Sequence, residues 1–135
     1  VSCRPGRVPF TEALAQADVI SLHCPLTTAT TKLFNAEVFA AVKPNALLIN
    51  TARGGLSDEE ALLNALQNGT LGGAALDVVT QEPPAPDNIL IRANLPNLLI
   101  TPHMAWASAE ARQRMVIQLA DNIQAFLQGN PRHQV

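Results

Sequence analysis

Four short runs of apolar residues recur along the chain, each bounded by Gly, Pro or charged residues. They are VISLHC at residues 19–24, ALLINT at 46–51, GAALDVV at 73–79 and NLLIT at 97–101. The runs are continuous rather than alternating, which is typical of strands that are covered on both faces in a parallel sheet. The pattern therefore predicts four parallel strands.

Stretches with helical spacing separate these runs, and three polar residues are expected to cap them. These are Thr11 for a helix over residues 12–17, Asn35 for one over residues 36–42, and Ser57, which begins a capping box with the acidic residues 58–60 for a helix that closes at Asn68-Gly69. The acidic residues are interpreted as charges that the helix dipole favours, not as catalytic carboxylates.

The longest helix is expected between Ser108 and Gln128. Its apolar stripe comprises Met115, Leu119, Ile123 and Phe126, widened by Val116, Ala120 and Leu127. Strands and helices thus alternate along the chain, which indicates an α/β fold with a doubly wound parallel sheet. We expect a partial, Rossmann-like sheet followed by a long C-terminal helix.

Three residues with complementary chemistry follow three of the apolar runs, on loops marked by Gly or Pro. They are Arg53 in INTARGG, Glu82 in VTQEPP and His103 in ITPHMAW. A guanidinium can grip a carboxylate with two hydrogen bonds, and an imidazole held by a carboxylate can exchange a proton near neutral pH. Because doubly wound sheets bind ligands beyond the carboxyl ends of their strands, the set indicates redox chemistry on a small 2-keto or 2-hydroxy acid.

The matching order of several motifs extends this interpretation over nearly the whole chain. HCPLTTATTKLFN, LINTARGGLSDEEAL, GGAALDV with EPP, and TPHMAW resemble the C-terminal part of a D-isomer-specific 2-hydroxyacid dehydrogenase. Trp106 and the following SAEARQRM are most similar to the glycerate dehydrogenase (hydroxypyruvate reductase) branch, since the phosphoglycerate dehydrogenase branch is expected to carry small residues in place of the Trp. Glu82 stands where the formate dehydrogenases have Gln, which argues against that branch.

The resemblance implies a role for each member of the set. Arg53 would bind the substrate carboxylate and polarise its carbonyl. His103 would give a proton during reduction and accept one during oxidation. Glu82 would hydrogen-bond His103 and raise its pKa. The resemblance also implies an NAD or NADP cofactor, whose contacts would come from Cys24, Pro25, Thr51, Ala52, Arg53, Asp77, His103 and Ala105.

Two of these interpretations stay open. Asp77 would contact the nicotinamide carboxamide, but an Asp at the end of a strand is often only a turn former. Trp106 belongs either to the site or to plain packing against the last helix.

One feature of the family is absent from the sequence. The seven glycines stand at 6, 54, 55, 69, 72, 73 and 129. None forms the G-x-G-x-x-G turn that seats a pyrophosphate on a helix N-terminus. We therefore expect a fragment in which residues 1–105 form part of an NAD(P)-binding domain without its first βαβ unit, and residues 106–135 return toward an absent substrate domain. Alone it should be inactive and bind NAD(P) weakly or not at all.

The two strands of the absent βαβ unit would affect how the remaining strands pair. The resemblance implies that they would lie between the runs at 19–24 and 46–51. Either these two runs pair directly, or another chain fills the gap.

The amino-acid composition limits the kinds of partner that the chain is expected to bind. Charged residues make up 15% of the chain, against roughly 25% in typical domains, which indicates surfaces normally covered by further structure or a second subunit. A net charge of −2 gives no electrostatic case for nucleic acid or an anionic membrane. Cys3 and Cys24 have no metal-binding or redox spacing and are expected to be free thiols. The expected parent is a cytoplasmic homodimer without a metal.

Two classes of function remain. The first is an enzyme that transfers a hydride between NAD(P)H and a 2-keto acid such as hydroxypyruvate or glyoxylate, giving D-glycerate or glycolate. The second is a non-enzymatic, dinucleotide-sensing protein similar to the C-terminal-binding corepressors. Those proteins keep the same Arg, Glu and His, so the three residues do not separate the classes.

Overall fold

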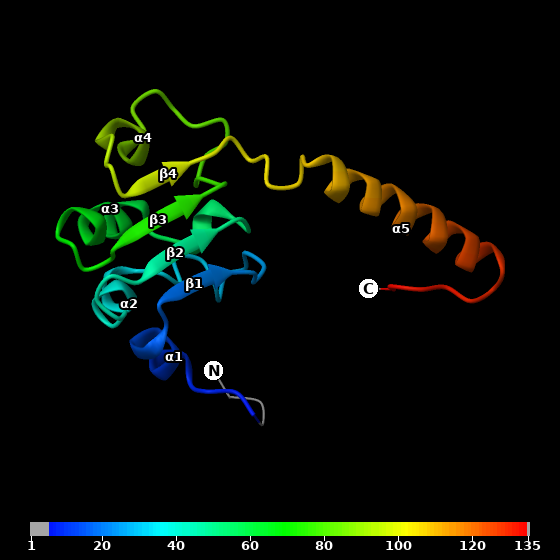
Figure 1. The fold of residues 1–135 in the computed structure, drawn as a ribbon, viewed down its shortest axis with the longest axis horizontal. Coiled ribbons are helices and arrows are strands. Elements are labelled where there is room, and N and C mark those ends of the chain that lie inside the picture. The colour runs from blue at the N-terminus through cyan, green and yellow to red at the C-terminus, as the bar shows by residue number, and fades with distance from the viewer. Residues whose placement is uncertain (1–5, 135) are drawn as a thin grey trace. The chain divides into compact units, whose positions relative to one another are not determined.

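A computed structural model describes residues 6–134, which divide into two compact units, one ending at His103 and one starting at Met104. The first unit holds a four-stranded sheet and four short helices, and the second holds one long helix (Figure 1). The elements are α1 (Phe10–Gln16), β1 (Val19–Leu22), α2 (Ala36–Ala40), β2 (Leu47–Asn50), the 3-10 turn η1 (Gly54–Leu56), α3 (Glu59–Gln67), β3 (Gly73–Leu76), α4 (Ile89–Ala93), β4 (Leu98–Ile100) and α5 (Ala109–Leu127).

The four predicted strands are confirmed as one parallel sheet in the order β1-β2-β3-β4. β1 pairs directly with β2, with Val19 opposite Leu47, so the first of the two alternatives for the sheet holds. The pairing runs over the full length of both strands, so no other described strand lies between them. The register also aligns the last residues of all four strands: Leu22, Asn50, Leu76 and Ile100.

The helices of the first unit cover one face of the sheet. Each crossover steps to the next neighbour in the same direction, and right-handed crossovers of that kind keep their helices on one side. The other face carries Val19, Leu47 and Leu99, which are 52%, 46% and 61% exposed. The expectation of strands covered on both faces is therefore not met within this unit.

The core between sheet and helices is built from aliphatic side chains around two aromatic rings. Phe34 lies edge-on to Phe10 and tilted against Phe39, with ring centroids 6.0 and 5.9 Å away. The largest fully buried apolar side chains are Phe34, Phe39, Leu48, Leu56, Leu62, Leu71 and Leu90. Leu56 belongs to η1, so the core extends directly beneath the loop that carries Arg53.

One predicted cap, Asn35, is confirmed, and the structure adds a cap at Ser108. The Asn35 side chain accepts from the N–H of Val38, and Ser108 accepts from the N–H of Ala111 at the start of α5. The length of α5 also agrees with the prediction, and its apolar stripe is exposed in its own unit. Among residues 6–134, no helix has the length and apolar character needed to cross a bilayer.

The other two predicted caps are wrong. α1 begins at Phe10 directly after Pro9, whose carbonyl accepts the first helical bond, so Thr11 lies inside the first turn. The cap of α3 is Asp58, which accepts from the N–H groups of two following residues, whereas the Ser57 N–H closes η1. The side-chain oxygen of Ser57 is buried without a hydrogen-bond partner.

Candidate active site

The loops that carry Arg53, Glu82 and His103 all leave the same edge of the sheet. The strands end in register, so the segments that follow β2, β3 and β4 emerge side by side. The His103 Nδ1 and Glu82 Oε2 atoms are 2.6 Å apart. Arg53 lies close enough for its charge to act on the Glu82 carboxyl. The structure thus brings the three predicted residues together.

A buried amide shapes the turn that presents Arg53. Asn50, the last residue of β2, is only 1% exposed. Its Nδ2 donates to the Arg53 carbonyl over 2.9 Å and its Oδ1 accepts from the Ala52 N–H over 3.0 Å. The side chain of Arg53 remains exposed, and its Nη1 donates to the Ala52 carbonyl over 2.7 Å. The sheet therefore fixes the backbone of the Arg53 turn, while the guanidinium faces solvent.

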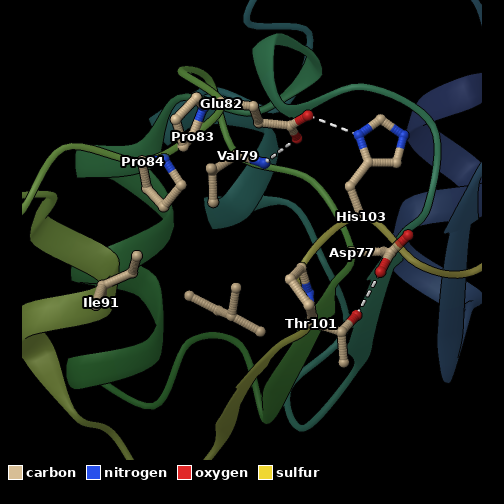
Figure 2. Close-up of a pocket in the computed structure, with 10 residues that line it drawn as sticks. Asp77, Val79, Glu82, Pro83, Pro84, Ile91, Thr101 and His103 are labelled. Carbon is tan, nitrogen blue, oxygen red and sulfur yellow. Dashed lines mark hydrogen bonds and ion pairs between the residues drawn. The ribbon is translucent and has the colours of Figure 1, made fainter.

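Glu82 is held from two sides. Its Oε1 accepts from the Val79 N–H over 3.0 Å, and its Oε2 meets the imidazole of His103 (Figure 2). Partial burial acts to raise the pKa of Glu82. This effect is outweighed by the hydrogen bonds from His103 and Val79 and by the charges of His103 and Arg53, so the pKa lies below its ordinary 4.5. The carboxylate is therefore ionised throughout the neutral range.

His103 adopts a backbone conformation that few non-glycine residues take. Its φ is +52°, in the left-handed region, and its N–H donates to the carbonyl of Thr101 over 3.0 Å. Such strain persists where surrounding structure enforces it, often at functional sites. Thr101, which precedes His103 by two residues, is tied to the end of β3 because its hydroxyl donates to Asp77 over 2.5 Å. Figure 2 shows that the turn directs the imidazole toward Glu82, with the second ring nitrogen pointing away from it.

Gly54 lets the Arg53 loop pack directly on the loop that carries Glu82. A Cβ atom on Gly54 would overlap the carbonyl carbon of Val79 and the backbone nitrogen of Thr80. Both partners are backbone atoms, so no side-chain rotation can relieve the overlap. The two loops therefore touch backbone to backbone, which only glycine at this position allows.

Gly54→Ala should consequently destabilise the fold by roughly 3 kcal/mol, the upper part of the usual range for overpacking. Chemical denaturation of both proteins measures this loss. Gly55→Ala is the matched control, because a Cβ there would meet only the side chain of Leu26 at 3.0 Å. Equal stability of the two variants would show that the loops do not depend on this contact.

A cleft of about 310 Å³ opens beside the Glu82–His103 pair. Most of its walls are apolar, and Figure 2 shows Ile91 of α4 and the two prolines after Glu82 around it. It is lined by Asp77, Val79, Glu82, Pro83, Pro84, Ile91, Ile100, Thr101, Pro102 and His103. The side chains of His103 and Glu82 are themselves 44% and 34% exposed, so the pair lies at the mouth of this cleft, within reach of solvent.

The residues expected to contact the cofactor lie along the same edge, with one exception. Cys24 and Pro25 follow β1, Thr51 and Ala52 follow β2, and Asp77 follows β3. Asp77 is 4% exposed, and its carboxylate accepts from the hydroxyl of Thr101, which directly follows β4. Ala105 belongs to the second unit, as does Trp106, which is exposed there.

The sequence patterns did not identify three supporting features. Asn50 stands inside an apolar run, and a polar residue there is the only signal that its side chain holds a turn. Gly54 was expected only as a loop marker. α4 was not predicted, since five residues are too few to show helical spacing, although Asn88 caps it by accepting from the N–H groups of Leu90 and Ile91.

Comparison with known proteins places this geometry in a family. Residues 3–105 match the model of the D-isomer specific 2-hydroxyacid dehydrogenase, NAD binding domain. The chain belongs to this family. The family match and the Rossmann-like parallel sheet confirm the predicted fold class and the implied nicotinamide cofactor.

Individual proteins similar to this chain are also dehydrogenases and reductases of this kind. The chain is 55% identical over 130 residues to a glycerate dehydrogenase of Methylorubrum extorquens, covering 96% of this chain and 41% of the relative. It is 42% identical over 124 residues to a hydroxypyruvate reductase of Blautia hydrogenotrophica, covering 92% and 38%. The structure of a D-lactate dehydrogenase with NAD+ from Lactobacillus jensenii has a TM-score of 0.78 at 31% identity, covering 95% and 42%. The chain thus spans about two-fifths of the length of these proteins.

Proposed function

We propose that this chain is the part of an NAD(P)-dependent D-2-hydroxyacid dehydrogenase that carries its acid–base pair and its carboxylate-binding arginine. The observation that supports the proposal most directly is the 2.6 Å contact between His103 and the ionised Glu82, with the charge of Arg53 beside it. The similarity to a glycerate dehydrogenase and a hydroxypyruvate reductase favours hydroxypyruvate and D-glycerate as the reacting pair. Glyoxylate and glycolate are the alternative pair.

The edge of the sheet suits a nicotinamide cofactor. The residues expected to bind it follow the aligned carboxyl ends of three strands, and a dinucleotide bound beyond those ends of a Rossmann-like sheet would meet them. Cys24, Pro25, Thr51, Ala52 and Asp77 would hold it. When bound, the nicotinamide would supply the hydride for reduction and accept it for oxidation.

The three residues divide the remaining chemistry. Arg53 would hold the carboxylate of the 2-keto acid with two parallel hydrogen bonds and so orient the carbonyl. As the carbonyl carbon gains a hydride, its oxygen gains a proton, and protonated His103 would donate that proton. Glu82 would stabilise the imidazolium and keep its ring oriented. Oxidation reverses these steps, with neutral His103 accepting the proton of the alcohol.

A hydride-transfer assay on the complete enzyme tests the proposal. With hydroxypyruvate or glyoxylate present, the absorbance of NADH or NADPH should fall, and D-glycerate or glycolate with the oxidised cofactor should restore it. Tight binding of the dinucleotide without turnover of any 2-keto acid would instead support the corepressor-like alternative.

The isolated chain should behave differently from the complete enzyme. It contains no G-x-G-x-x-G turn, which would supply backbone N–H groups to the pyrophosphate. Calorimetric titration of the chain with NAD and NADP should therefore show no binding in the micromolar range. Micromolar binding would mean that the residues around Asp77 suffice for affinity.

Glu82→Gln should move the pH dependence of reduction. The amide keeps the shape of the side chain but not the charge that stabilises a protonated His103. In the variant, the reduction rate should therefore decline at a lower pH than in the wild-type enzyme, which the pH profile of kcat/KM measures. An unchanged pH profile would show that the charge of Glu82 does not affect proton transfer by His103, and that Glu82 acts only as a solvated loop residue.

Glu82 should also make the folding stability depend on pH, with its contribution lost in acid. Because its pKa is lowered in the folded state, its contribution to stability is fully present above pH 4.5 and is lost as the pH falls through the lowered pKa. The wild-type protein and the Glu82→Gln variant should therefore converge in stability in acid.

A further inference from the structure

Glu59, in the first turn of α3, makes contacts that its place in the sequence does not predict. Its Oε1 accepts from the Thr80 N–H over 2.8 Å, and its Oε2 accepts from the Asn88 side-chain amide over 3.0 Å. Thr80 and Asn88 lie at the two ends of the proline-rich loop that carries Glu82. One half-buried carboxylate therefore grips both ends of this loop.

The Thr80 end of the loop is fixed by two contacts. Glu59 binds the Thr80 N–H, and Gly54 packs against the Val79–Thr80 backbone. The neighbouring Val79 N–H donates to Glu82 itself. A shift of this backbone would therefore move the carboxylate that meets His103.

The Asn88 end links the same grip to the cleft. Asn88 donates to Glu59 through Nδ2 and accepts from the N–H groups of Leu90 and Ile91 through Oδ1, so it joins α3 to the start of α4. Ile91 forms part of the cleft wall. The Asn88 amide cannot reverse without losing its role as the cap of α4.

We propose that Glu59 is a positioning residue for the reaction: it clamps the loop at residues 80–88 and thereby holds Glu82 at hydrogen-bonding distance from His103. The proposal rests on the proposed dehydrogenase function. The Glu59 side chain binds Thr80 and Asn88 at the ends of the loop, so its effect on Glu82 and His103 passes through the loop. The Glu59 carboxylate thus has two roles: its charge is favoured by the dipole of α3, and its oxygens hold the loop.

The test compares Glu59→Ala, Glu59→Gln and Glu60→Ala in the complete enzyme. Glu59→Ala should lower kcat roughly 10- to 100-fold, the scale expected when a catalytic group is misplaced by about 1 Å. Its pH profile for reduction should shift in the direction of the Glu82→Gln profile. Glu59→Gln should restore part of the rate, because its side-chain oxygen can still accept from Thr80, whereas its amide nitrogen would face the donor of Asn88.

Glu60→Ala is the matched control, since Glu60 is an exposed carboxylate in the same helical turn and does not share the Glu59 hydrogen bonds to Thr80 and Asn88. Its kcat and pH profile should match those of the wild type. A Glu59→Ala enzyme with the wild-type pH profile, even if it is less stable, would overturn the proposal, because a merely structural role lowers stability without moving the profile.

Amide hydrogen exchange provides a readout that does not depend on turnover. Exchange across residues 80–88 should accelerate in Glu59→Ala and stay unchanged in Glu60→Ala, and unchanged exchange in Glu59→Ala would overturn the clamp. If the wild-type enzyme reduces no 2-keto acid, the proposed function fails, while the exchange measurement still decides whether Glu59 holds the loop.

Discussion

His103→Ala should lower the kcat of the complete enzyme by roughly 10²–10⁴-fold, the usual contribution of a positioned acid or base. Affinity for NADH or NADPH should change little, because the proton moves only during the chemical step. Single-turnover kinetics and a fluorescence titration of the cofactor separate the two effects.

The left-handed backbone at residue 103 calls for a second variant. Alanine is disfavoured at a φ of +52°, whereas asparagine tolerates this region, so His103→Asn removes the proton donor with less strain. Both variants should lose activity to a similar extent. If His103→Asn kept most of the wild-type rate, the loss in the alanine variant would be a backbone effect and the proton-transfer role would be wrong.

Arg53→Lys should cost more than the retained charge suggests. An ammonium group cannot form the two parallel hydrogen bonds that a guanidinium makes with a carboxylate, and a hydrogen bond to a charged group contributes about 1.5–3 kcal/mol. The kcat/KM for the 2-keto acid should therefore fall by at least about tenfold.

Arg92→Lys on α4 provides the comparison for Arg53→Lys, because Arg92 is an exposed arginine on a neighbouring element. Its kcat/KM should equal that of the wild type. Equal values for the two variants would show that Arg53 acts only as a point charge.

The strands could be predicted from sequence because their cause is local. Each apolar run between Gly, Pro or charged residues supplies a strand, and parallel pairing follows from the helices between them. The cap of α3 could not be predicted from sequence, because Ser57 and Asp58 are both good capping residues. The backbone of η1, which the Ser57 N–H closes, decides between them. α4 was missed because its five residues depend on Asn88 and on packing.

The site shows a similar division. Arg53, Glu82 and His103 were identifiable because their residue types form a chemical set and each follows a strand. The residues that hold them in place were not, because their roles depend on contacts between distant segments. Glu59 binds a loop 21 residues away in sequence, and Gly54 is required by the backbone of Val79. Sequence therefore indicates the candidate reacting groups better than the residues that hold them in place.

The direct packing of Gly54 on the Val79–Thr80 backbone has a consequence for protein engineering. Segments 50–59 and 77–88 share this contact and the Glu59 hydrogen bonds, so they form one transferable piece. A graft of the Arg53 turn alone onto another α/β scaffold would lack the Val79–Thr80 backbone on which it packs, and mutations in the Arg53 turn would also disturb the loop that carries Glu82. If the proposed function holds, libraries that aim to change substrate preference should therefore vary Ile91 and Ile100 in the cleft wall and leave both segments intact.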